Sequence, residues 1–291
     1  MALVLFSGAL PQARASMPLT ETIATLPEGG AGFSIREEFF TPKDGRRREY
    51  AGIDLGALPW LNLGFRFTYL HGDGGYGGQG EIGDAFIRLW MDTGDYLGDR
   101  LHTGLLTYFR IPTGRNVYED RIWRNMAYGN NELKIGPVMQ YDAGHEFFHA
   151  NLFYAFRERD REGFYDRLRL NPLDKEFFTR ALGLNPAARG SFLDPALLGN
   201  DYLAVACAVN TSRAYPFIPF IELYASRGIS PDRETRGLGI EGSRRVSLLA
   251  GLGLRYFFSQ GVFAGAYAIA NPLPGGTRFR ETAGVEMAAW F

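Results

Sequence analysis

About twelve segments of this chain alternate between apolar and polar residues with a period of two, and this pattern constrains the fold more than any other feature. In the stretch LNLGFRFTYL, Leu61 and Phe65 share one parity, whereas Asn62 and Arg66 share the other. Successive side chains of a β-strand point to opposite faces, so each segment is predicted to be a strand with one apolar and one polar face. The predicted strands cover residues 31–42, 48–58, 61–72, 80–93, 101–112, 131–142, 147–159, 201–212, 217–228, 244–258, 262–272 and 280–291.

The connections between these strands alternate between short and long. Tight links are predicted at 59–60, 93–100, 142–145, 215–216 and 259–261, and most connections between them are longer and more polar. Outer-membrane barrels have tight periplasmic turns and long extracellular loops. We therefore predict an all-β fold, a transmembrane antiparallel β-barrel of about twelve strands with both termini in the periplasm. A soluble β-sandwich would also alternate, but here the apolar faces are nearly continuous and no second apolar set is left to form a core.

The polar faces carry charges of both signs. An isolated charge in hydrocarbon costs several kcal/mol, so these side chains are predicted to face the lumen of the barrel. The predicted lumen-lining residues are Arg36, Asp54, Arg66, Asp84, Arg88, Arg110, Glu222, Arg255 and Glu286. Neighbouring strands would bring together Asp54 with Arg66, Asp84 with Arg110, and Arg255 with Glu286. Two functions stay open for such ladders, because they could fill and close a narrow barrel or set the electrostatics of a polar channel.

Composition excludes several other classes of protein. The longest apolar run is shorter than the ~18 residues of a transmembrane helix. The net charge is −1, which gives no indication of a nucleic-acid partner. The single cysteine, Cys207, cannot form a disulfide within one chain and is predicted to be a small buried or lipid-facing residue.

Catalytic and metal sites are not predicted, although one motif invites the question. His145, Glu146 and His149 form the sequence HEFFH, which matches the zinc motif HExxH. That motif needs a helix, whereas on a strand the two histidines would be ~13 Å apart, too far to share one zinc ion. A turn before the motif and alternation after it favour a strand. No Ser–His pair has the spacing of a membrane hydrolase, so we predict neither enzyme activity nor a cofactor.

Both ends of the chain carry a recognisable pattern. Residues 1–15 resemble a signal peptide with an Ala13-Arg14-Ala15 cleavage site, although the usual basic start is missing. We expect export and a barrel domain over 16–291; a buried N-terminal strand is the alternative. The segment VEMAAWF reads as the last strand, and the aromatic Phe291 resembles the signal by which bacterial barrel-assembly machinery recognises its clients.

The long connection over 160–200 is predicted to contain a short helix. Asn171 is placed to cap it, Pro172 stands at its first position, and Gly183 at its end. The apolar candidates for a constriction in this loop are Leu173, Phe177, Phe178 and Leu182. The loop could fold into the mouth of the barrel, cap it, lie on the membrane surface or cover the extracellular rim.

The stretches PLTETIATLPEGGAGFSIREE, DGRRREY and GIDLGALPWLNLGFRFTYLHG resemble the outer-membrane proteins linked to the meta-pathway of phenol degradation. The likeness covers roughly residues 18–115. It implies a small barrel that moves hydrophobic or aromatic compounds across the outer membrane. The helix-bearing loop over 160–200 departs from the pattern of that family.

These observations predict a protein of the bacterial outer membrane. We expect an outer-membrane channel for passive passage of small, hydrophobic or aromatic molecules. The alternative is a closed structural barrel that acts as a scaffold, an adhesin or a subunit of an envelope assembly. The expected partners are membrane lipid, the barrel-assembly machinery through Phe291, a small hydrophobic substrate and, for the alternative, other envelope proteins.

Overall fold

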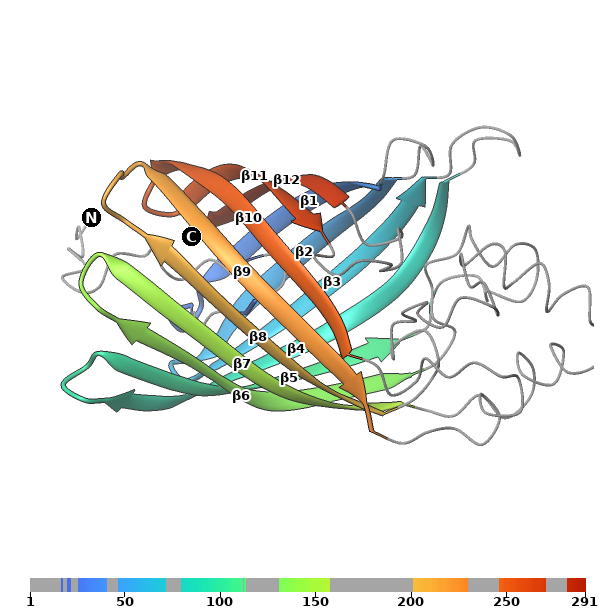
Figure 1. The fold of residues 1–291 in the computed structure, drawn as a ribbon, viewed down its shortest axis with the longest axis horizontal. Coiled ribbons are helices and arrows are strands. Elements are labelled where there is room, and N and C mark those ends of the chain that lie inside the picture. Colours follow the sequence, from blue (N-terminus) through green and yellow to red (C-terminus); the bar gives the residue numbers. More distant parts are fainter. Residues whose placement is uncertain are drawn as a thin grey trace, which may run out of the picture.

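In the computed structural model the chain forms a closed antiparallel barrel of twelve strands (Figure 1). The structure describes residues 17, 20–21, 26–40, 47–71, 80–111, 113, 131–157, 201–229, 246–270 and 282–291. The strands are β1 (Ala31–Phe40), β2 (Arg47–Leu58), β3 (Leu61–His71), β4 (Gly80–Tyr96), β5 (Leu101–Ile111), β6 (Glu132–Asp142), β7 (Glu146–Arg157), β8 (Tyr202–Thr211), β9 (Phe217–Gly228), β10 (Val246–Ser259), β11 (Val262–Ala270) and β12 (Thr282–Trp290). The prediction of an all-β twelve-stranded barrel is confirmed.

Every strand pairs with its neighbours in sequence, and β1 pairs with β12 to close the wall. The closing register runs from Gly32 opposite Trp290 to Phe40 opposite Thr282. Closure leaves no strand edge unpaired, which a barrel in a membrane requires because lipid cannot satisfy backbone hydrogen bonds. The predicted helix and constriction residues Leu173, Phe177, Phe178 and Leu182, and the predicted signal peptide, lie outside the described residues.

One predicted connection is shorter than expected. The link between the fourth and fifth strands was expected from Thr93, but β4 continues to Tyr96 and the turn covers 97–100. A bulge shifts the register between Asp92 and Gly94, and the φ of Gly94 is +121°. Glycine tolerates this conformation without steric cost. In the sequence Gly94 therefore indicated a turn, whereas in the structure it forms a bulge and the strand continues after it.

The described short connections all lie at one end of the barrel. They join β2 to β3, β4 to β5, β6 to β7, β8 to β9 and β10 to β11. In an up-and-down barrel such alternate connections share one end, and β1 starts and β12 finishes at this same end (Figure 1). We call it the tight-turn end.

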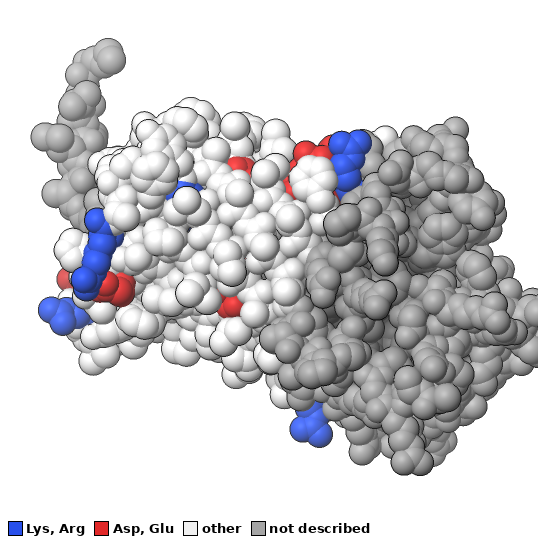
Figure 2. All heavy atoms as spheres, turned by 45° about the horizontal axis from the view of Figure 1, so that its top comes forward, with Lys and Arg blue, Asp and Glu red and all other residues white. Residues whose placement is uncertain are grey.

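The outward face of the wall is apolar. Ile221, Leu252 and Met287 are 60%, 63% and 57% exposed, and they lie in the middle of β9, β10 and β12. On the face shown in Figure 2, most of the described surface is uncharged, and most of the Lys, Arg, Asp and Glu atoms lie near its two ends. An exposed apolar belt of this extent is larger than the apolar patches of soluble proteins, and it matches the hydrocarbon layer of a membrane. Among the described residues, no helix has the length and hydropathy to cross a membrane.

The inward face differs from the prediction in one respect, because it also contains apolar clusters. Near the tight-turn end, Ile218, Phe257, Phe263 and Ala288 are buried together, with Trp290 against them. A second cluster surrounds Leu106 and a third surrounds Phe220. The wall makes room for these rings with glycine, since the ring of Tyr267 lies where a Cβ on Gly284 would be, and that of Phe220 where one on Gly253 would be.

Candidate functional site

All nine predicted lumen-lining residues lie on the inward parity of their strands. Six of them are buried, with side chains that water hardly reaches: Asp84, Arg88, Arg110, Glu222, Arg255 and Glu286. The other three, Arg36, Asp54 and Arg66, are partly exposed to the interior space. The alternation of the strands thus brings the charged side chains together, whereas the idea that they line a conducting path stays a prediction.

Two of the three predicted ion pairs form. Arg255 Nε lies 2.6 Å from Glu286 Oε1, and Arg110 Nε lies 3.6 Å from Asp84 Oδ2. Glu286 also receives Arg36, whose Nη2 is 3.4 Å from Oε2. Glu286 is therefore shared between a cation on the adjacent β1 and one on β10, two strands away, whereas Arg110 and Asp84 lie on the adjacent strands β5 and β4.

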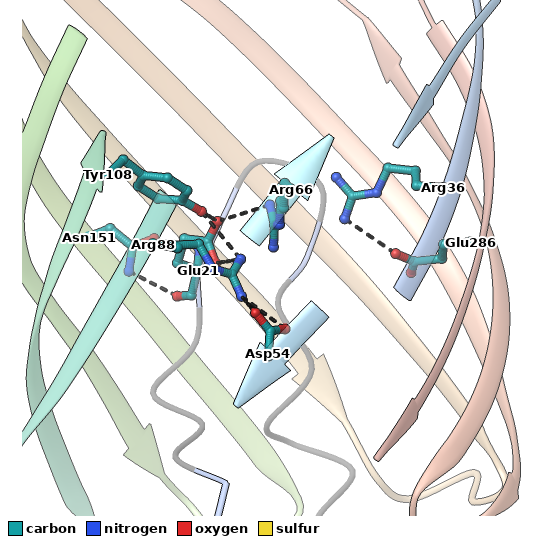
Figure 3. A network of polar contacts seen from close by, with 8 residues as sticks. All are labelled: Glu21, Arg36, Asp54, Arg66, Arg88, Tyr108, Asn151 and Glu286. Carbon is teal, nitrogen blue, oxygen red and sulfur yellow. Dashed lines mark hydrogen bonds and ion pairs between the residues drawn. The ribbon is translucent and has the colours of Figure 1, made fainter. Parts of the chain in front are cut away.

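The predicted pair of Asp54 with Arg66 is replaced by a larger network. Asp54 Oδ1 lies 3.2 Å from Arg88 Nη2, on a strand two positions away in the barrel. Arg66 Nη1 instead lies 3.8 Å from Glu21 Oε1. Glu21 belongs to no strand, so the network joins the wall to a part of the chain that precedes it (Figure 3).

This part of the chain is the N-terminal segment (described residues 17, 20–21 and 26–30), in which Met17, Thr20 and Glu21 are enclosed by the wall and residues 27–29 are exposed. It is fixed at the tight-turn end, where Gly29 N donates to Gly56 O at 2.9 Å and Gly56 N donates to Gly30 O at 2.9 Å. Towards the opposite end, Met17 is 2% exposed and packs in the cluster that contains Leu249 and Ile269. The described residues of the segment are therefore held at two places, Gly29 and Gly30 at the tight-turn end and Met17 in the buried cluster.

Glu21 lies between these two ends, and its backbone is held as firmly as its side chain. Glu21 N donates to Asn151 Oδ1 at 2.8 Å, and Asn151 Nδ2 donates to Glu21 O at 2.9 Å. These two hydrogen bonds pair the backbone N–H and C=O of Glu21, which belongs to no strand and so takes no part in the hydrogen bonding of the sheet. Asn151 itself is 2% exposed on the inner face of β7.

The carboxylate of Glu21 accepts hydrogen bonds from Arg88 and Tyr108 and forms an ion pair with Arg66. Arg88 Nη1 lies 3.2 Å from Oε2, Arg66 Nη1 lies 3.8 Å from Oε1, and the hydroxyl of Tyr108 donates to Oε1 (Figure 3). The guanidinium of Arg88 also lies 3.3 Å from the centre of the Trp90 ring. We call Arg66, Arg88 and Tyr108 the carboxylate cradle.

The cradle and the N-terminal segment balance each other in charge. The wall supplies two guanidinium groups, from Arg66 and Arg88, against one neighbouring carboxylate, that of Asp54. It therefore carries a net positive charge at this point, and the carboxylate of Glu21 neutralises it. In a low-dielectric interior an uncompensated charge is costly, so this balance fixes the segment in place.

Sequence reasoning missed Glu21. The residue falls in the stretch PLTETIATLPEGG, which precedes the first strand and has no periodicity to assign it to a face. One pattern in the sequence could have indicated it. The inward arginines Arg66 and Arg88 outnumber the neighbouring carboxylate of Asp54, so a further carboxylate from another part of the chain could be expected beside them.

The metal alternative fails on geometry. His145 lies in the turn before β7 and His149 on the strand, where its Nε2 is 2.9 Å from Asn210 Oδ1. HEFFH is therefore not on a helix, and the zinc arrangement is not formed. Within the described ranges, no three His, Cys, Asp or Glu side chains lie close enough together to hold a metal ion.

The closed wall, the apolar belt and the charged interior define the class of protein. This is a transmembrane β-barrel of the kind found in the bacterial outer membrane, and the predictions of this fold and class are confirmed.

Comparison with known proteins refines this only at the level of the fold. No protein-family model and no curated protein matches the chain. Among solved structures, the COG4313 outer membrane channel from Pseudomonas putida F1 is similar with a TM-score of 0.57 at 11% identity, over 92% of this chain and 97% of that one. The NanC porin gives 0.53 at 9% identity, and the KdgM porin 0.51 at 6%, each over 89% of this chain and 99% of that one.

These three proteins are named as porins or channels, and the expectation that the chain is not an enzyme stays a prediction. At such low identity the likeness concerns the fold. Membership of the phenol meta-pathway family has no matching family model and stays a prediction.

Proposed function

We propose that this protein is a channel of the bacterial outer membrane for small molecules, and that its own N-terminal segment restricts the passage. The observation that carries the proposal is the interior itself. Charged side chains line much of the wall between its apolar clusters, and the segment inside it is held by polar contacts to Arg66, Arg88 and Asn151.

Stability alone gives no reason for such an interior. Replacing a buried ion pair by well-packed apolar residues is often neutral or stabilising by ~1–4 kcal/mol. A barrel that served only as a scaffold could close with apolar side chains, as this one does near Phe257 and Phe263. A polar passage needs groups that exchange hydrogen bonds with water and solute, and charged walls provide them.

The substrate that we propose is a small solute with both a polar and an apolar part. Aromatic rings lie next to the interior cations: Trp90 against Arg88, and Phe263 4.7 Å from the Arg255 guanidinium carbon. Hydrophobic or aromatic solutes fit this arrangement. The loop over 160–200, from which an apolar constriction was predicted, lies outside the described residues.

A closed structural barrel is the second candidate, and the packing of the interior favours it. Arg255, Leu106 and Ile218 are each 1% exposed or less, so part of the cross-section is filled. In this case the long connections would contact other envelope proteins. For either function we propose membrane lipid around the apolar belt and recognition of Phe291 by the barrel-assembly machinery.

Bilayer recordings separate the two candidates. The full chain in a planar bilayer should give single-channel currents, and proteoliposomes containing it should swell in small solutes. Lys134 faces the interior, with its Nζ 4.5 Å from the centre of the Tyr108 ring, so Lys134→Glu should shift the reversal potential in a salt gradient towards cation selectivity. Arg213→Glu makes the same change of charge in an exposed turn and should shift it less. Absence of current and of swelling for every solute would leave the closed barrel.

A further inference from the structure

We propose that the carboxylate cradle is a binding site for small carboxylate solutes, which Glu21 occupies in this structure. A solute carboxylate takes the place of the Glu21 side chain when the N-terminal segment moves away. The site rests on the proposed function in one respect, since only a channel gives solutes a reason to reach it.

The cradle is built by the wall alone. Arg88 and Tyr108 are direct partners in the register of β4 and β5, and Arg88 faces Gly64 of β3 on its other side. Arg66 lies two residues beyond Gly64 and therefore on the same face. Three side chains from three adjacent strands thus converge, and the backbone pairing of these strands does not involve Glu21.

The occupant is not part of the wall. Glu21 is attached through its backbone to Asn151, whereas its carboxylate alone reaches the cradle. Its side chain is 13% exposed, so a small part of the carboxylate's surroundings is open while Glu21 is in place. With the segment displaced, Arg66 and Arg88 face one carboxylate, Asp54, and the remaining positive charge attracts an anion.

The chemistry of the donors selects a carboxylate with an apolar body. Guanidinium groups and a phenol hydroxyl match the planar oxygens that Glu21 now presents. The guanidinium of Arg88 is stacked on Trp90, and the Tyr108 ring lies beside Lys134 Nζ, so aromatic surface borders the site. A ring attached to the carboxylate would contact that surface.

Calorimetric titration in detergent tests the site without requiring transport. Sodium benzoate and sodium acetate are the carboxylate probes, and benzyl alcohol is the neutral control. Glu21→Ala should bind benzoate at least about tenfold more tightly than the unaltered chain, because the competing side chain is gone. Glu37→Ala removes an exposed carboxylate on β1 and should leave binding as in the unaltered chain.

A second substitution assigns the binding to the cradle. In the Glu21→Ala background, Arg66→Gln should weaken benzoate binding by about tenfold or more. Arg66 is 22% exposed, so this variant is expected to fold, which the shift in gel mobility on heating checks. Arg88→Gln in the same background should weaken benzoate binding as well. If this variant fails to fold because Arg88 is buried, the Arg66 variant alone shows whether benzoate binds to the cradle.

The outcomes are distinct. Benzoate binding that Glu21→Ala does not strengthen, or that Arg66→Gln leaves unchanged, overturns the site. Equal binding of benzyl alcohol and benzoate also overturns it, because the ring and not the carboxylate would then be recognised. Benzoate binding to the cradle without current in any variant upholds the site and refutes the channel.

Discussion

Glu286 offers the sharpest test of how the charged interior contributes to stability. Its carboxylate serves two cations, Arg255 at 2.6 Å and Arg36 at 3.4 Å. The side chain of Arg255 is 2% exposed and that of Arg36 is 17% exposed. Glu286→Gln keeps the shape of the side chain and removes its charge, so the buried guanidinium of Arg255 loses the carboxylate that lies 2.6 Å from it.

The expected cost can be worked out from this geometry. Two unit charges ~4 Å apart attract by ~4 kcal/mol at an effective dielectric constant of ~20. Removing one partner of a buried pair costs ~3–5 kcal/mol in measured cases. Arg36 is partly hydrated and contributes less, and the amide oxygen of glutamine still accepts one hydrogen bond. We therefore expect the free energy of unfolding to fall by about 3 kcal/mol.

Urea unfolding from phospholipid vesicles, followed by tryptophan fluorescence, measures this change. Glu37→Gln is the matched control on the surface, because Glu37 pairs with Arg47 at 3.3 Å but their side chains are 27% and 48% exposed. The control should cost less than ~1 kcal/mol. If both variants lose the same small amount, the interior is wetter than the structure indicates, and the argument from burial is wrong.

Three further outcomes are expected. Ile221→Arg places a charge on the outward face in mid-strand and should lower the free energy of unfolding from vesicles by ~2–4 kcal/mol. Leu97→Arg, in the exposed turn after β4, should leave it nearly unchanged. Equal effects of the two substitutions would contradict the assignment of the apolar belt. Tyr267→Phe removes a 2.9 Å hydrogen bond to Glu38 and should lower the free energy of unfolding by ~1–2 kcal/mol, and an unchanged urea midpoint would show that water replaces the hydroxyl. Cys207 lies on the outward face of β8, where lipid covers it in vesicles. A hydrophilic maleimide should therefore label the urea-unfolded chain and not the folded barrel. Rapid labelling of the folded protein would show that this face is in water.

The strands and the facing of their side chains were predictable because both follow from residues close together in the sequence. Alternation assigns each residue to a face, so the inward position of Arg255 and the outward position of Leu252 follow from one count along β10. The pairing of Arg255 with Glu286 needs one more step, across β11, and the up-and-down order of strands supplies it. A charge in the middle of a strand had to face inward, since lipid excludes it, whereas charges near the strand ends such as Glu37 can lie on the outward face.

The contents of the barrel were not predictable in the same way. Glu21 reaches Arg88 across 67 residues of sequence, and no period links the two. The apolar clusters inside the wall were missed for a related reason, since a buried Phe257 and an outward Phe258 differ only in parity and an inward aromatic looks like part of an apolar run. What fills a cavity depends on three-dimensional volume, which a pattern along one strand does not contain.

The hydrogen bonds of Gly29 and Gly30 to Gly56 tether the N-terminal segment eight residues along the chain from Glu21. A group on so short a tether competes as though its concentration were in the millimolar range, whatever the solution around it contains. A free carboxylate therefore has to reach a comparable concentration before it occupies the cradle for most of the time. The anchor at the tight-turn end thereby sets a concentration threshold, and a longer or shorter segment would move that threshold without any change in the wall.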